Sequence, residues 1–394
     1  MKLIGERVSS FATLACDRAW VEIDLAALAH NVSQLKSLLS PATALLAVVK
    51  ADAYGHGAIA VAQTVLQSGA SWLGVATVLE GIELREAGIA APILILGATH
   101  IPEQVQAITH WRLQPTLCSP KQALVFSETL KSSNGTAPIP VHIKIDTGMS
   151  RLGPSWQQAS EFVQLVQRLP NLYIASIYSH LATAESVDQT VMRQQQSRFE
   201  QAIAQIRKAE ASHSLLPALH LANSAATLTD PALHYNMVRV GLSLYGLYPA
   251  AHLQQVIELK PALQVKARIT QVKTIPPGTG VSYGHQFITK QEIRLAVVGI
   301  GYADGVPRNL SNKMTVLLRG QQVPQIGTIT MDQLMLDVSS IPDTQPGEVV
   351  TLLGRQAEEC IWADDWATQL GTISWEILCG FKHRLPRVAV GQFF

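Results

Sequence analysis

The hydrophobic pattern changes character about two thirds of the way along the chain. Before residue 259, apolar runs rich in β-branched residues alternate with stretches of helical spacing, such as 155–169 and 186–211. The apolar runs lie at 45–50, 72–77, 93–97, 113–117, 141–146, 173–179, 218–223 and 238–241. Strands that alternate with helices indicate parallel β/α units, and eight of them predict a closed (β/α)8 barrel of the TIM type. An open doubly wound sheet is less favoured, because no G-x-G-x-x-G motif follows the first strand.

After residue 259 the helical spacing fades and alternating or β-rich runs take over. These runs lie at 263–274, 293–299, 314–318, 323–326, 334–338 and 349–353. Turn sequences such as PPGTG at 276–280 separate them, and a short helix at 361–370 and a strand at 387–393 end the chain. We therefore predict a mostly antiparallel β domain at 259–394. It follows a barrel at 1–258, in which residues 1–17 form a loose lead-in and Asp24 caps the first helix.

Composition and charge exclude several classes of function. The chain has 30 Lys and Arg against 29 Asp and Glu, and no basic block, which argues against a nucleic-acid or membrane-surface partner. No apolar run approaches the ~20 residues needed to cross a bilayer. The cysteines show neither C-x-x-C nor zinc-ligand spacing, so we expect free thiols, no metal site and a cytoplasmic location. They are Cys16, Cys118, Cys360 and Cys379.

The stretch AVVKADAYGHG, at 47–57, ends an apolar run in a single lysine, Lys50. Burial disfavours a charged ammonium, so a lysine at the edge of an apolar wall tends to lose its proton. A neutral amine can attack a carbonyl and form a Schiff base, for which pyridoxal phosphate is the common partner. The alternative is a strand-end lysine that reaches into solvent, and spacing alone does not separate the two.

Polar residues follow several of the predicted barrel strands, where barrels place their active sites. Tyr54 lies four residues after Lys50, and His180 follows the sixth strand in YSHLATAE. Ser224, after the seventh strand, begins a helix whose N–H groups can face an anion, and Gly241 lets the backbone approach closely. Barrels often bind phosphate in these two loops. A helix-cap serine and a packing glycine remain the alternatives.

The segment VHIKIDTGMSRLG, at 141–153, is the second distinctive motif. Lys144 and Asp146 share one face of a strand because side chains alternate with a period of two. Arg151 lies in the following loop, where its guanidinium can grip a carboxylate at two points. A buried ion pair between Lys144 and Asp146 is compatible with a role in support of the site.

Three motifs in the predicted β domain also carry polar or aromatic residues. They are TGVSYGHQF with Tyr283, GIGYADGVPR with Tyr302, and GTITMDQ with Met331 and Asp332. A tyrosine beside a glycine in a turn is often only a turn residue, so their physical chemistry alone does not assign them a function.

From about Ala19 to the C-terminus, the motifs together resemble those of bacterial alanine racemases, in the same order. They are VVKADAYGHG, KIDTGMSRLG, SHLATAE, ANSAAT, VRVGLSLYG, VSYG, GYADG and MDQ. The resemblance implies a barrel plus β domain, pyridoxal phosphate on Lys50, and a head-to-tail homodimer with active sites shared between subunits. It also implies interconversion of L- and D-alanine by two bases on a pyridoxal phosphate imine, which supplies D-alanine for peptidoglycan.

The resemblance also assigns roles to the matching positions. Lys50 would be the base on the D-alanine face, and Tyr283 of the partner subunit the base on the L-alanine face. Arg151 would bind the substrate carboxylate, with the backbone of the partner's Met331 nearby. Lys144, which is carbamylated in many relatives, would orient Arg151.

The remaining positions would hold the cofactor. Arg239 would bond the pyridine nitrogen, backed by His220, and His180 would lie against the ring. Because arginine keeps its proton, that nitrogen would stay neutral. Tyr302 and Asp332 would support the site. The residues expected to hold the phosphate are Tyr54, Ser224, Gly241 and Leu242.

Two positions depart from the pattern of the family. Trp375 stands where many relatives have a tyrosine, and it offers the phosphate an indole N–H instead of a hydroxyl. Thr330 stands where many relatives have a cysteine.

The competing functions are a broad-specificity amino-acid racemase on the same scaffold, an amino-acid decarboxylase of similar architecture, and a pyridoxal phosphate carrier. VSYG with Tyr283 and the MDQ motif argue against the decarboxylase, and the β domain argues against the carrier.

Overall fold

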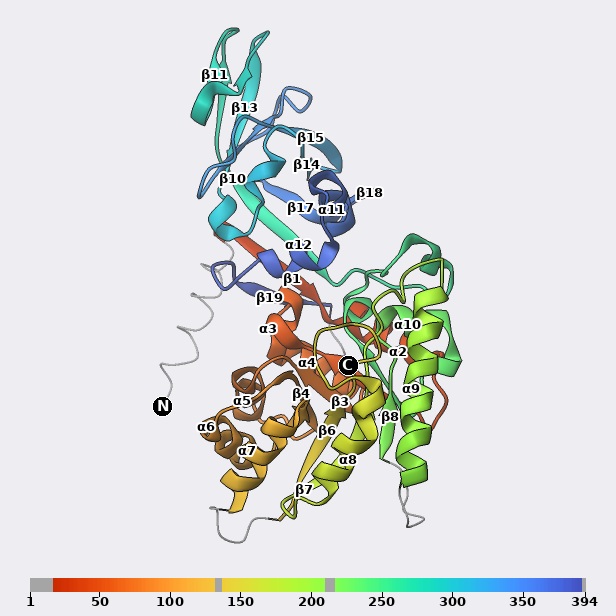
Figure 1. Ribbon diagram of the computed structural model, residues 1–394. Helices are drawn as coiled ribbons and strands as arrows, with labels where there is room; N and C mark the ends of the chain where they lie inside the picture. Colours follow the sequence, from red (N-terminus) through yellow and green to blue (C-terminus); the bar gives the residue numbers. More distant parts are fainter. Residues whose placement is uncertain (1–16, 132–136, 210–216, 392–394) are drawn as a thin grey trace.

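A computed structural model describes residues 17–131, 137–209 and 217–391, and Figure 1 shows its two parts. One part is a ring of parallel strands with helices outside it, and the other is a mostly antiparallel sheet. This arrangement confirms the fold class predicted from the hydrophobic pattern. Cys16 and the predicted lead-in, apart from residue 17, lie outside the described residues.

Eight parallel strands form the barrel in the order β8-β7-β6-β5-β4-β3-β2-β9. They are β2 (Ala44–Val48), β3 (Trp72–Val75), β4 (Ile93–Ala98), β5 (Gln114–Leu117), β6 (Ile139–Lys144), β7 (Leu172–Tyr178), β8 (Ala218–His220) and β9 (Met237–Val240). The ring nearly closes, because the N–H of Asn236 donates to Leu219 and that of Arg239 donates to Ala222, each at 3.0 Å. All eight strands overlap the apolar runs found in the sequence.

The helices lie mainly outside the ring, and their apolar faces pack on it. They are α2 (Leu25–Ser37), α3 (Lys50–Gly55), α4 (Ala58–Gln67), α5 (Val78–Glu86), α6 (Pro102–His110), α7 (Pro120–Lys131), α8 (Ala159–Gln167), α9 (Thr190–Ala209) and α10 (Ser224–Thr229). Local sequence explains several of their starts. The Asp24 carboxylate accepts the N–H of Ala27, as the sequence predicted, and Thr77 with Glu80 forms a capping box on α5.

The β domain is built on a nine-stranded sheet in the order β18-β17-β14-β15-β16-β13-β10-β1-β19. Its strands are β1 (Ala19–Asp24), β10 (Leu263–Ile275), β13 (Ile293–Val298), β14 (Thr315–Leu318), β15 (Gln321–Ile326), β16 (Leu334–Asp337), β17 (Val349–Gln356), β18 (Glu359–Ile361) and β19 (Arg387–Val390). A hairpin of β11 (Gly280–Val281) and β12 (Phe287–Ile288) extends from it, and α11 (Ala363–Leu370) and α12 (Ser374–Gly380) cover it.

Strand β1 differs from the sequence-based division of the chain. The prediction assigned everything up to residue 258 to the barrel, whereas β1 pairs antiparallel with β10 and parallel with β19. The chain therefore begins its described part in the β domain and then enters the barrel through α2. The strand with which β1 pairs lies far away in the sequence, for example Ala19 opposite Ala267. The hydrophobic pattern around β1 therefore could not show which sheet the strand joins.

Short 3-10 turns complete the fold. They are η1 (Trp156–Gln158), η2 (Pro231–Leu233), η3 (Leu242–Tyr245), η4 (Ala251–Gln255), η5 (Tyr283–His285), η6 (Tyr302–Asp304) and η7 (Arg308–Leu310). One continuous apolar core runs from the barrel into the β domain, with a smaller cluster near the β11–β12 hairpin.

Cys118, Cys360 and Cys379 are free thiols. Among the described residues, no helix is both long and apolar enough to span a bilayer.

Candidate active site

A cavity of about 530 Å³ opens at the carboxyl ends of the barrel strands. This volume lies in the ordinary range for small-molecule sites. Nine residues expected to form the site line it: Lys50, Tyr54, Lys144, Arg151, His180, Ser224, Arg239, Gly241 and Leu242. Trp375 and Cys379, also noted in the sequence, line it as well. His220 lies behind them, in hydrogen-bond contact with Arg239. The structure thus brings together the predicted barrel residues.

Lys50 lies just beyond the end of β2 and is half-buried. Burial lowers the pKa of its amine, and the Arg151 guanidinium lowers that pKa further, while Glu80 opposes the shift. The Glu80 carboxylate accepts two backbone N–H groups of the pocket wall, that of Ala51 at 2.8 Å and that of Ala76 at 2.7 Å. Lys50 therefore has an amine that loses its proton more readily than that of an exposed lysine.

The backbone after Lys50 takes a left-handed turn. Ala51, Asp52, Ala53 and Tyr54 have φ between 51° and 55° and ψ between 37° and 51°, although none of them is glycine. Each such residue costs roughly 1–2 kcal/mol relative to a right-handed conformation. Three contacts hold the turn: the bond from Ala51 to Glu80, the Asp52 carboxylate on the N–H of Ala58 at 2.8 Å, and close packing of Gly55 on α12. The result is that Tyr54 is buried and faces the cavity.

Next to this turn, after the neighbouring strand β9, lies a close-packed cradle around Gly241. A Cβ atom at Gly241 would lie 2.5 Å from the Tyr54 hydroxyl, so no larger residue fits without displacing that tyrosine. The Gly241 N–H donates to the Ser224 hydroxyl at 3.0 Å. The helix cap beside it is Asn223, which accepts the N–H of Ala226. Ser224 is therefore not the cap residue, and its hydroxyl lines the cavity.

Arg239 extends into the barrel interior from β9. Its Nη2 donates to the carbonyls of Ser179 at 2.8 Å and Leu221 at 3.2 Å, and contacts Nδ1 of His180 at 3.2 Å. Its Nη1 donates to Nδ1 of His220 at 3.1 Å. Burial lowers the pKa of Arg239 to about 10, so the guanidinium stays charged at neutral pH. Within the described parts of the chain, its Nε–H has no partner, so a donor remains for an acceptor in the cavity.

Tyr178 is a functional candidate that sequence reasoning missed. Its ring stacks on His220, with centroids 4.6 Å apart, and Nζ of Lys144 lies 4.4 Å from its centroid. Burial, Arg239 and Arg151 hold the pKa of Lys144 well below its usual range. The one available signal was position, because Tyr178 precedes His180 by two residues and therefore faces the same side of the strand.

Asp146 does not form the buried ion pair with Lys144 that its spacing suggested. Its carboxylate accepts the N–H groups of Gly148, Met149 and Ser150 at 2.9 to 3.1 Å. These bonds shape the loop that brings Arg151 to the cavity, so Asp146 acts on the site through the backbone.

The β-domain candidates lie apart from this cavity in the same chain. Tyr283, Tyr302 and Met331 are 73%, 41% and 53% exposed. Hydrogen bonds join their loops: the Tyr302 N–H donates to the carbonyl of Thr330 at 3.0 Å, and the Thr328 hydroxyl donates to the carbonyl of Tyr283 at 2.8 Å. Figure 1 shows β11, which precedes Tyr283, at the end of the β domain away from the barrel. One chain therefore does not bring Tyr283 to Lys50.

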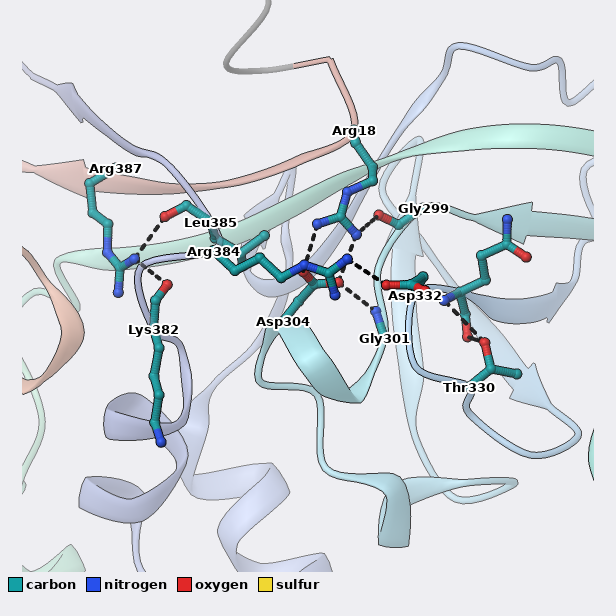
Figure 2. Close-up of polar contacts among 11 residues, drawn as sticks. Arg18, Gly299, Gly301, Asp304, Thr330, Asp332, Lys382, Arg384, Leu385 and Arg387 are labelled. Carbon is teal, nitrogen blue, oxygen red and sulfur yellow. Dashed lines mark hydrogen bonds and ion pairs between the residues drawn. The ribbon is translucent and has the colours of Figure 1, made fainter.

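Ion pairs hold the Asp332 loop, as Figure 2 shows. The buried Asp304 carboxylate accepts two hydrogen bonds from Arg18, at 2.7 and 2.6 Å, and lies 3.5 Å from Arg384. Arg384 in turn pairs with Asp332 at 2.5 Å. Residues next to β1 thus help to position the exposed loops that carry Tyr302, Met331 and Asp332.

Comparison with known proteins yields one family throughout. The model of the alanine racemase N-terminal domain matches residues 23–249, and that of the C-terminal domain matches 262–389. An alanine racemase of Nostoc sp. is 72% identical over 373 residues, covering 95% of this chain and 96% of its own. An alanine racemase of Synechocystis sp. is 64% identical and covers 95% and 99%. The structure of a Clostridium difficile alanine racemase, 35% identical, superposes with a TM-score of 0.89 over 95% of this chain and 96% of that one.

Proposed function

The chain belongs to the alanine racemase family, and from that premise we propose that it works by two bases, Lys50 and a partner subunit's Tyr283. The protein is an isomerase that interconverts L- and D-alanine. The broad-specificity racemase considered as an alternative is not favoured, because the curated relatives and structural neighbours are alanine racemases. The lining of the cavity supports the proposed roles.

The cavity suits pyridoxal phosphate in its donor set. Four cationic or amine side chains, Lys50, Lys144, Arg151 and Arg239, face one carboxylate, Glu185, which matches an anionic cofactor and a carboxylate substrate. The close cradle of Tyr54, Ser224 and Gly241 offers hydroxyls for the phosphate, and the free donor of Arg239 suits the pyridine nitrogen. When bound, this cofactor delocalises the negative charge that develops as a substrate Cα loses its proton.

Lys50 would hold the cofactor and move a proton on the D-alanine face. Its lowered pKa supports both roles, because each requires an uncharged amine. Arg151 would hold the substrate carboxylate by two hydrogen bonds, and Lys144 would orient Arg151. His180 and Tyr178 line the same cavity and would keep water away from the Arg239 guanidinium.

Tyr283 would act from a second copy of the chain. The side chain is exposed and follows β11, which lies at the end of the β domain away from the barrel, and Met331 and Tyr302 are exposed in other loops of the same domain. A head-to-tail homodimer would place this end of one subunit over the barrel mouth of the other, completing the site.

Hydrogen exchange at Cα tests the two-base mechanism most cleanly. L- and D-alanine have equal free energies, so kcat/KM must fall equally in both directions in any variant. In deuterated buffer, we expect Tyr283→Phe to exchange the Cα hydrogen of D-alanine through Lys50 while the exchange of L-alanine is lost. Chiral separation and mass spectrometry measure both.

The control is Tyr173→Phe, which removes the hydroxyl of an exposed tyrosine on β7. We expect it to exchange both enantiomers as the unmodified enzyme does. Equal residual exchange of both enantiomers by Tyr283→Phe would contradict the assignment of the two faces.

Two wider roles belong to the same proposal. D-alanine made by this reaction would supply peptidoglycan synthesis, and the enzyme would work in the cytoplasm. The near-neutral charge and the free thiols are compatible with that location.

A further inference from the structure

A row of polar side chains crosses the interior of the barrel beneath the cavity and meets the cavity wall at Arg239. Barrel interiors are usually filled by Val, Ile and Leu. Here five neighbouring strands each contribute a polar residue, and four of these residues are at most 4% exposed. From β5 to β9 they are Gln114, His142, Ser176, His220 and Arg239. His142 and Ser176 each precede a residue of the cavity wall, Lys144 and Tyr178, by two positions.

Four hydrogen bonds join these residues into one chain. Nη1 of Arg239 lies 3.1 Å from Nδ1 of His220, and Nε2 of His220 lies 2.7 Å from the hydroxyl of Ser176. The Ser176 hydroxyl lies 2.6 Å from Nδ1 of His142, whose Nε2 lies 2.8 Å from Oε1 of Gln114. Every ring nitrogen in the row has a partner.

The chain of bonds has only one consistent direction. A guanidinium can only donate, so Nδ1 of His220 accepts and its proton is on Nε2. Ser176 accepts that proton and donates its own to Nδ1 of His142. His142 then carries its proton on Nε2 and donates to the amide oxygen of Gln114, which can only accept. The direction required from the arginine end agrees with that required from the glutamine end.

Both imidazoles are neutral in this arrangement. Burial lowers the pKa of His142 to about 3. Burial and then the charge of Arg239 hold the pKa of His220 well below its usual range. Among the described residues no carboxylate contacts either ring, and the groups that face the row from the adjoining layer are Lys144, Tyr178 and Trp72.

We propose that Ser176 and His142 are positioning residues for Arg239, acting through the tautomer of His220. With its proton on Nε2, His220 presents a lone pair that holds the guanidinium in place. With the other tautomer, two donors would meet and Arg239 would be pushed from its position. The role of Arg239 toward the pyridine nitrogen rests on the proposed function, whereas the tautomer does not.

The direction of the row is tested by nitrogen-15 spectra of histidine-labelled holoenzyme, with His142→Gln and His220→Gln used to assign the two rings. We expect the Nε2–H tautomer for both, unchanged between pH 5.5 and 8.5. An Nδ1–H tautomer or a charged ring at either position in the unmodified enzyme would overturn the inference, even if no variant folds.

The effect on Arg239 is tested by Ser176→Ala, with Ser176→Thr as the conservative variant and Ser127→Ala as the matched control. Ser127 is also buried, and within the described residues its hydroxyl has no partner. We expect Ser176→Ala to shift the His220 tautomer and to raise the dissociation constant of pyridoxal phosphate about tenfold or more, because a buried donor and acceptor lose their partners. Ser176→Thr should retain both properties.

Two results would overturn the positioning role: an unchanged dissociation constant in Ser176→Ala, or an equal increase in Ser127→Ala. The unmodified enzyme separates this failure from a failure of the proposed function. If it binds pyridoxal phosphate through Lys50 and Ser176→Ala is unchanged, only the positioning role is wrong. If it does not bind the cofactor at all, the proposed function is wrong and the tautomers still stand.

Discussion

At the scale of single residues, burial decides the chemistry of the site. Lys50, Lys144, His180 and His220 all have pKa values below their ordinary range, with burial as the largest cause in each case. Desolvation favours the uncharged form of amines and imidazoles, so the side chains in and behind the cavity release a proton more readily than exposed ones do. Arg239 stays charged because its pKa is lowered only to about 10.

The same effect at His56 links protonation to stability. His56 is fully buried near the site, with Nδ1 on the carbonyl of Tyr54 at 3.1 Å and its ring 4.4 Å from that of Tyr245. Burial lowers its pKa from 6.5 to about 4. The folded protein therefore binds a proton more weakly than the unfolded chain, and stability falls as the pH drops from 6.5 towards 4.

We expect His56 alone to lower the free energy of unfolding by roughly 1 kcal/mol per pH unit across that window. His56→Gln should be less stable at pH 7.5 but should lose less stability on acidification to pH 5. Thermal unfolding midpoints at the two pH values measure this, with the exposed His100→Gln as the control. A variant that loses as much stability on acidification as the unmodified protein would refute it.

At the scale of elements, the left-handed turn of α3 is the least expected feature. The sequence predicted a strand that ends in Lys50, whereas β2 ends at Val48 and the turn begins at Lys50. Four non-glycine residues in this conformation are strained, and contacts from α5 and α12 hold them there. The strain fixes the path of the backbone between Lys50 and Tyr54.

Ala51→Gly should relieve part of that strain. Ala51 is exposed with φ 53°, and glycine adopts this conformation without a Cβ clash. We expect the free energy of unfolding to rise by about 1 kcal/mol and kcat to fall severalfold, because the backbone beside Lys50 gains freedom.

Ala357→Gly is the matched control for this prediction. Ala357 has the same φ of 53° and is exposed in the β17–β18 turn, far along the chain from Lys50. It should gain similar stability without losing turnover. Denaturant unfolding and steady-state rates distinguish the two variants, and unchanged turnover in Ala51→Gly would count against a functional role for the strain.

Periodicity was sufficient to predict the elements of the barrel but not every detail of the site. All eight barrel strands appeared as apolar runs, because strands buried on both faces are continuously hydrophobic. Helix α12 was missed because its seven residues are too few for a helical pattern. The left-handed turn was missed because its residues have no glycine signature, and Tyr178 was missed because an aromatic at a strand end is ordinary.

At the scale of the whole molecule, β1 joins the two parts. It leads from the β-domain sheet into α2 of the barrel, and Arg18 beside it binds Asp304. The Asp304 side chain is fully buried, so its charge depends on Arg18 and Arg384 for compensation. This network also reaches the loop of Met331 and Asp332, which the proposed dimer would place in the partner's site.

Arg18→Ala should therefore destabilise the protein by about 2 kcal/mol, since it leaves the buried carboxylate with only the Gly301 N–H and the more distant Arg384 as partners. Arg319→Ala is the control, because Arg319 pairs with Asp343 and Glu348 at the surface of the same domain. It should change stability little. Equal unfolding midpoints for both variants in denaturant would show that the buried ion pairs of Arg18 stabilise the protein no more than the surface ion pairs of Arg319 do.

The central claim, that one subunit supplies Lys50 and the other Tyr283, is tested most directly by mixing two inactive variants. Lys50→Ala and Tyr283→Phe should each have little racemase activity. After subunit exchange, half of the dimers would be mixed, and each mixed dimer would have one site with both residues intact. We expect the mixture to recover about one quarter of the unmodified activity, as a symmetric dimer requires. Activity no greater than the sum of the two separate variants, with exchange verified by mass, would contradict the claim.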